Sequence, residues 1–176
     1  MKLSKKQMTI KYSVYCLLIL LAEIFQSVNG LFPEINGARC FFIIPVTVIL
    51  TIDEDPKIAA LLGLLAGLAW DCLAVRHMGF NMVFFTIMCY ILASCTEFLF
   101  RATFWMQLVG AVIANVFYCL CYWLLFMVIN PSEGSVESIW YFYVPSMIYT
   151  SVMSFIACLV LKPIKRKVGF SKKIEE

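Results

Sequence analysis

Charged residues are scarce in this sequence. Asp, Glu, Lys and Arg make up 14% of its 176 residues, whereas 62% of the residues are hydrophobic. An ordinary soluble domain is far less apolar, so the composition excludes that class. In lipid, a backbone satisfies its hydrogen bonds only as helices or as a closed barrel, and long apolar runs without two-residue alternation favour helices. We therefore predict an all-α, polytopic integral membrane bundle.

The residues of common catalytic and metal sites are also few. His77 is the one histidine, and none of the eight cysteines forms a CxxC pair. The sequence contains no P-loop and no dinucleotide-binding glycine fingerprint, and its loops are too short for an extramembrane catalytic domain. We interpret the cysteines as small buried apolar side chains. We predict that the protein is not an enzyme and binds no metal, other cofactor or nucleic acid.

Six apolar runs form one expected transmembrane domain of residues 1–176, with spans at about 12–28, 40–52, 58–75, 80–99, 105–129 and 139–161. With both termini in the cytoplasm, twelve of the fourteen basic residues lie inside and only Arg39 and Arg76 outside, as the positive-inside rule requires. The run 40–52 is short for a hydrocarbon core of about 30 Å, so it either thins the bilayer, borrows flanking residues or is re-entrant. The basic tail after residue 161 serves as a topology anchor that could also bind anionic lipid.

Small residues form a stripe in the third run. Ala59, Gly63, Gly67 and Asp71 are spaced four residues apart, so they lie on one face of a helix. Small side chains at this spacing let a second helix approach closely. We predict that residues 59–79 are the packing centre of the bundle.

A few polar residues in or near the spans are candidates for contacts. Glu23 should face protein rather than lipid, and Asn115 could donate a hydrogen bond across a helix interface. Asp71, Arg76, His77 and Asn81 cluster at the external end of the third span and the start of the fourth. They could bind a small molecule, but pairing of Asp71 with Arg76, or capping of neighbouring backbone by Asp71, is the favoured interpretation because polar groups gather at helix ends.

Three acidic residues, Asp53, Glu54 and Asp55, precede Pro56. Asp55 can cap the following helix while Pro56 occupies its first turn. The Asp53-x-Asp55 spacing also matches a pattern by which some sugar-nucleotide transferases hold a divalent cation. The capped loop is favoured, because Asp and Pro commonly begin helices.

One stretch carries a family resemblance. It reads Gly63-Leu-Leu-Ala-Gly67-Leu-Ala-Trp-Asp71, and Gly79-Phe80 and then Tyr90 follow it. With the chain length, the six runs and the short second run, this stretch resembles MreD, the bacterial rod shape-determining membrane protein family. The resemblance implies that Gly63, Gly67, Asp71 and Gly79 determine the fold.

The resemblance also implies a function. The protein would be a non-enzymatic scaffold of the cell-elongation complex in the bacterial cytoplasmic membrane, helping to position peptidoglycan synthesis. It would bind MreC directly and work with MreB, RodA and a class B penicillin-binding protein. The architecture is similar to S components of energy-coupling-factor vitamin transporters, so a vitamin-binding S component is the alternative. S components often carry an A-x-x-x-A pair in the first span. The first span of this sequence lacks that pair, so the S-component alternative is less favoured.

Overall fold

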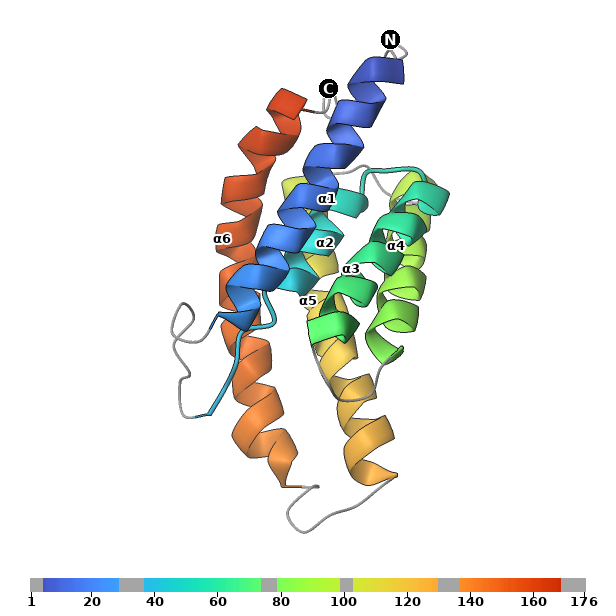
Figure 1. The fold of residues 1–176 in the computed structure, drawn as a ribbon. Coiled ribbons are helices and arrows are strands. Elements are labelled where there is room, and N and C mark those ends of the chain that lie inside the picture. The colour runs from blue at the N-terminus through green and yellow to red at the C-terminus, as the bar shows by residue number, and fades with distance from the viewer. Residues whose placement is uncertain (1–4, 29–36, 74–78, 99–102, 130–136, 169–176) are drawn as a thin grey trace.

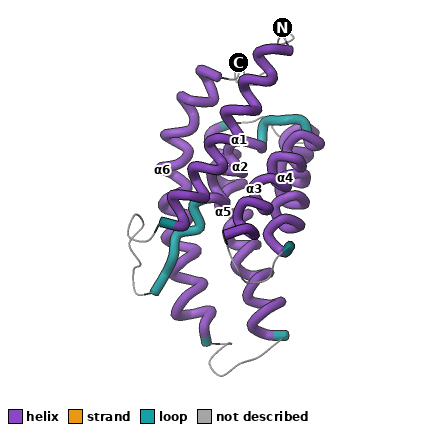
Figure 2. Tube along the Cα trace, viewed as in Figure 1, coloured by secondary structure: helices purple, strands orange, loops and turns teal. Residues whose placement is uncertain are grey.

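The computed structural model describes residues 5–28, 37–73, 79–98, 103–129 and 137–168, most of which are helical (Figures 1 and 2). The α-helices are α1 (Lys5–Ser27), α2 (Ile43–Thr51), α3 (Pro56–Leu73), α4 (Phe80–Phe98), α5 (Phe104–Tyr122) and α6 (Val144–Val168). Two π-helical segments, η1 (Trp123–Val128) and η2 (Ile139–Tyr143), extend α5 and precede α6. The predicted all-α class is confirmed for the described residues.

Among the described residues, five helical segments are long and apolar enough to cross a membrane: α1, α3, α4, α5 with η1, and η2 with α6. The short α2 is the exception. Its nine residues rise only about 14 Å, against a hydrocarbon core of about 30 Å. Five of the six predicted spans therefore contain a helix long enough to cross, whereas the second contains only the short, buried α2.

Residues 39–41, just before and at the start of the run 40–52, are not helical, and two of their backbone N–H groups bond to hydroxyls of α6. The backbone N–H of Arg39 donates to Ser146 Oγ, 3.0 Å away, and that of Phe41 donates to Thr150 Oγ1 on α6 at 3.0 Å. Backbone that is not helical is tolerated among apolar helices only where protein groups satisfy it. The hydroxyls of α6 therefore replace the helical hydrogen bonds that this segment lacks.

Every residue of α2 is buried, and α1, α3, α4, α5 and α6 all pack against it (Figure 1). The prediction placed the packing centre in residues 59–79. The structure instead gives the central position to α2, while α3 forms the most extensive helix pair, with α4. The apolar side chains of α2 therefore pack against protein on all sides rather than against lipid.

The start of α1, the turn between α2 and α3, and the end of α6 lie together at one end of the molecule (Figure 1). We call this the basic end, because Lys6, Lys11, Lys57 and Lys165 lie there. The end of α3, the start of α4 and the π-helical segments lie toward the opposite end, the far end.

Candidate functional site

The small-residue stripe of α3 faces α4. A Cβ atom on Gly63 would lie 2.5 Å from the carbonyl oxygen of Phe85, and one on Gly67 would collide with the Cα of Met82. Ala59 is completely buried beside α4. The two helices therefore approach so closely that backbone lies against backbone, which only glycine permits at these two positions.

Asp71 joins the end of α3 to the start of α4. Its Oδ2 accepts hydrogen bonds from the backbone N–H groups of Gly79 and Met82, both at 3.0 Å, and its Oδ1 accepts one from Asn81 Nδ2 at 2.9 Å. The side chain is buried. Asp71 thus caps neighbouring backbone. Arg76, its other candidate partner, lies outside the described residues.

The contacts of Asp71 continue into a cluster of aromatic rings. Asn81 Oδ1 accepts a hydrogen bond of 2.9 Å from the Tyr118 hydroxyl on α5. The Tyr118 ring stacks on Trp70 with centroids 5.0 Å apart, and Phe84 meets it edge to face at 5.1 Å. The polar atoms of this cluster therefore bond to one another, and aromatic side chains fill the space around them.

Gly79 has a backbone φ of +96°, in the left-handed region that favours glycine. This conformation brings its N–H to Asp71. The predicted structural position at Gly79 is thus the residue immediately before α4, and a side chain there would be strained.

Replacing Asp71 with alanine is expected to lower the free energy of unfolding by about 2–3 kcal/mol, since buried backbone donors lose their acceptor. The neighbouring Cys72 is exposed, so Cys72→Ala should change it by less than about 0.5 kcal/mol. Unfolding by SDS titration in mixed micelles measures both values. Equal stability of the two variants would contradict the bonding role of Asp71.

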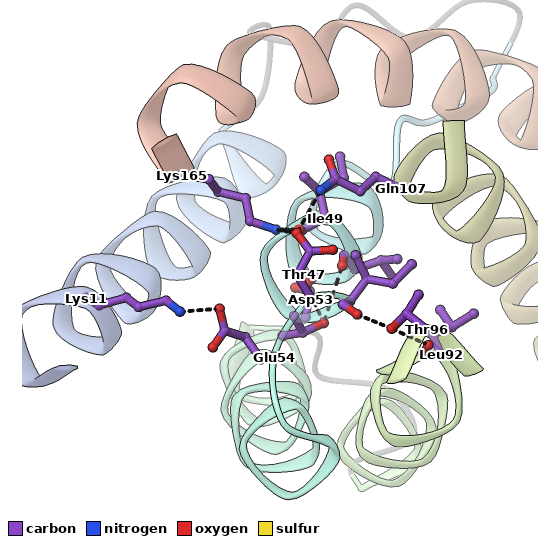
Figure 3. A network of polar contacts seen from close by, with 12 residues as sticks. Lys11, Thr47, Ile49, Asp53, Glu54, Leu92, Thr96, Gln107 and Lys165 are labelled. Carbon is purple, nitrogen blue, oxygen red and sulfur yellow. Dashed lines mark hydrogen bonds and ion pairs between the residues drawn. The ribbon is translucent and has the colours of Figure 1, made fainter. Parts of the chain in front are cut away.

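The basic end holds a second polar group of side chains, which the sequence analysis missed (Figure 3). Lys165 Nζ of α6 lies 2.6 Å from Asp53 Oδ2 and 2.5 Å from the carbonyl oxygen of Ile49. Gln107 Nε2 of α5 donates to the same Asp53 oxygen at 2.8 Å. The side chains of Lys165 and Asp53 are 4% and 1% exposed, so this ion pair is removed from solvent.

A second ion pair lies beside it. Lys11 Nζ of α1 is 2.6 Å from Glu54 Oε1, and the Tyr12 hydroxyl donates to Glu54 Oε2 at 3.4 Å. Two consecutive acidic residues therefore bind the first and the last helix to the turn after α2. Charges buried in pairs of this kind are costly to separate, because either partner alone would remain desolvated.

These contacts change the interpretation of residues 53–56 and of the basic tail. Asp55 caps α3 as predicted, with its Oδ1 accepting from the Lys57 backbone N–H at 2.9 Å. Asp53 lies in the turn after α2, where it is also the partner of Lys165, which the sequence analysis assigned to the topology anchor. The only available signal was the adjacency of acidic residues in an otherwise apolar chain.

The other two predicted polar residues are buried on different helices. Glu23 Oε1 accepts a hydrogen bond of 3.2 Å from Ser27 Oγ, one turn later on α1. Asn115 Nδ2 donates to the carbonyl oxygen of Met147 at 3.0 Å, across the interface of α5 and α6. Neither side chain joins the Asp71 cluster. Within the described ranges, no group of three His, Cys, Asp or Glu side chains is placed to hold a metal ion.

Comparison with known proteins identifies the family. The sequence model of rod shape-determining protein MreD matches residues 6–168. This chain belongs to the MreD family. No curated protein and no solved structure matches it. The resemblance seen in the sequence is confirmed. The family, together with the five described helices that are long and apolar enough to cross a membrane, makes the chain a multi-pass membrane protein of a family that determines rod shape. MreD is a structural family, not a known family of enzymes.

Proposed function

We propose that this MreD-family protein is a non-enzymatic scaffold of the cell-elongation complex in the bacterial cytoplasmic membrane. In this proposal it binds MreC directly and helps to position peptidoglycan synthesis, in concert with MreB, RodA and a class B penicillin-binding protein. The family match carries the proposal, because it spans nearly the whole chain.

The polar groups of the Asp71 cluster inside the bundle are already hydrogen-bonded to the protein, which favours partner binding at the outer surfaces over ligand binding in the interior. A small-molecule site needs convergent polar groups that remain open to the ligand. The Asp71 cluster has the right residue types, but both Asp71 oxygens accept hydrogen bonds from the protein, and Asn81 Oδ1 is bonded to Tyr118. Partners would therefore meet the helix faces and the two ends of the molecule.

Photo-cross-linking from these outer faces tests the proposal. One residue that is more than half exposed on each long helix is replaced by benzoylphenylalanine: Leu17, Leu61, Ile87, Ile113 and Ile148. Because a bound partner covers one side of a bundle, we expect adducts with MreC at one position or at neighbouring positions, and none at the others. An unrelated single-pass membrane protein at the same abundance is the control for random collision.

Two outcomes would overturn MreC binding. One is the absence of any adduct although the five variants are inserted and stable. The other is an equal yield with the unrelated protein at every position, which would indicate collision alone.

The alternative, a vitamin-binding S component, makes a different prediction. A vitamin at a hundred times its dissociation constant would add about 2.7 kcal/mol to stability and raise the unfolding temperature. The scaffold proposal predicts no shift with any vitamin of a panel. A reproducible shift that disappears in Asp71→Ala would favour the alternative.

A further inference from the structure

We propose that the basic end carries a binding site for one anionic phospholipid, formed by one face of α6 and the start of α5. The site comprises Phe104, Trp105, Phe155, Leu159, Lys162 and Arg166. The proposal depends on the membrane location of the bundle and is independent of MreC binding.

The start of α5 lies against one face of α6. The ring centroids of Phe104 and Phe155 are 6.1 Å apart. Lys162 Nζ lies 5.2 Å from the centroid of the Phe104 ring. Phe155 and Lys162 are seven residues apart, so they share a helix face, which Leu159 and Arg166 continue at four-residue steps. Phe104 thus aligns this face of α6 with the beginning of α5.

The polarity along this face matches a phospholipid. Phe155 and Leu159 are half exposed and apolar, whereas Lys162 and Arg166 are exposed cations nearer the basic end. Trp105, whose ring lies 6.1 Å from Phe104, is 69% exposed. Acyl chains would cover the apolar part, the phosphate would meet the cations, and the indole would lie at the headgroup level that tryptophan prefers.

The charges at this end leave Lys162 and Arg166 for an external anion. The nearby carboxylates of Asp53 and Glu54 are bound by the buried Lys165 and Lys11. In the part of the chain that the structure describes, no ion pair involves Lys162 or Arg166, and the first turn of α5 contains no acidic residue. A lipid phosphate is the anion that membrane-embedded cations meet at highest concentration.

Fluorescence quenching by brominated lipid tests the site. Trp123→Phe and Trp140→Phe leave Trp105 at the site and Trp70 buried near the far end. The full chain is placed in nanodiscs of phosphatidylcholine and phosphatidylglycerol, with the bromines on one lipid or the other at equal mole fraction. We expect brominated phosphatidylglycerol to quench Trp105 more strongly. A further Trp105→Phe variant gives the background from Trp70.

The matched pair of charge variants decides the assignment. Lys162→Gln with Arg166→Gln should abolish the preference for phosphatidylglycerol, since each basic residue at a membrane surface contributes about fivefold. Lys6→Gln with Lys57→Gln removes the same charge from exposed positions at the same end and should leave the preference unchanged. No preference in the unmodified site, or an equal loss in both double variants, would overturn the proposal.

Discussion

Replacing Gly67 with leucine is expected to prevent the bundle from forming. A Cβ at this position would meet the backbone of Met82 and Asn81 on α4, and backbone cannot move aside as a flexible side chain can. The variant should lose at least about 3 kcal/mol of unfolding free energy, at or above the upper end of ordinary overpacking. We expect little folded protein after extraction from the membrane, measured as the monodisperse fraction in size-exclusion chromatography.

The conservative control lies two residues away. Leu65 is partly exposed on another face of α3, so Leu65→Ile should fold normally. Gly67→Ala provides a graded step, because even one methyl group meets the α4 backbone. Normal yield of Gly67→Leu would contradict the close α3–α4 contact.

Replacing Lys165 with methionine is expected to have the second large effect. Methionine keeps the length of the side chain, but it leaves the buried Asp53 carboxylate with Gln107 as its one remaining side-chain partner among the described residues. Removing one member of a buried ion pair typically costs about 3–5 kcal/mol. SDS titration in mixed micelles measures this loss as a change in unfolding free energy.

A double variant separates the ion pair from general packing. Asp53→Leu combined with Lys165→Met removes both charges, so it should be more stable than Lys165→Met alone. Lys167→Met is the matched control, since Lys167 is an exposed lysine of the same helix and its loss should cost less than about 0.5 kcal/mol. If Lys165→Met lost no more stability than Lys167→Met, that result would contradict the buried pair between α6 and the turn after α2.

The α3–α4 pairing illustrates what sequence can predict. The four-residue spacing of Ala59, Gly63 and Gly67 indicates a close helix contact, because small residues on one face of a membrane helix let the backbone of a second helix approach. Their actual neighbours, Phe85 and Met82, lie within about two dozen residues along the chain. The partner is the next helix, so local order along the chain is enough to bring the contact together.

The buried ion pairs could not be predicted in the same way. Asp53 and Lys165 are separated by 112 residues, and nothing in either local sequence specifies the other. The same limit applies to α2. The backbone just before α2 bonds to hydroxyls of Ser146 and Thr150, which lie 107 and 109 residues later than their donors, so the local sequence does not indicate this packing.

Different polar contacts therefore stabilise the two ends of the molecule. At the far end, Asp71 closes the local α3–α4 hairpin. At the basic end, Asp53 and Glu54 hold the first and last helices, which are far apart in sequence. A scaffold needs a fixed arrangement of outer faces, and these internal contacts supply one without using the outer surfaces.

Direct binding to MreC is the most decisive measurement for the scaffold proposal. Purified protein in nanodiscs is titrated with fluorescently labelled, full-length MreC, and fluorescence anisotropy reports binding. We predict saturable binding that unlabelled MreC displaces and that an unrelated single-pass membrane protein does not. Absence of saturable binding by folded protein, or equal displacement by the unrelated protein, would contradict the account.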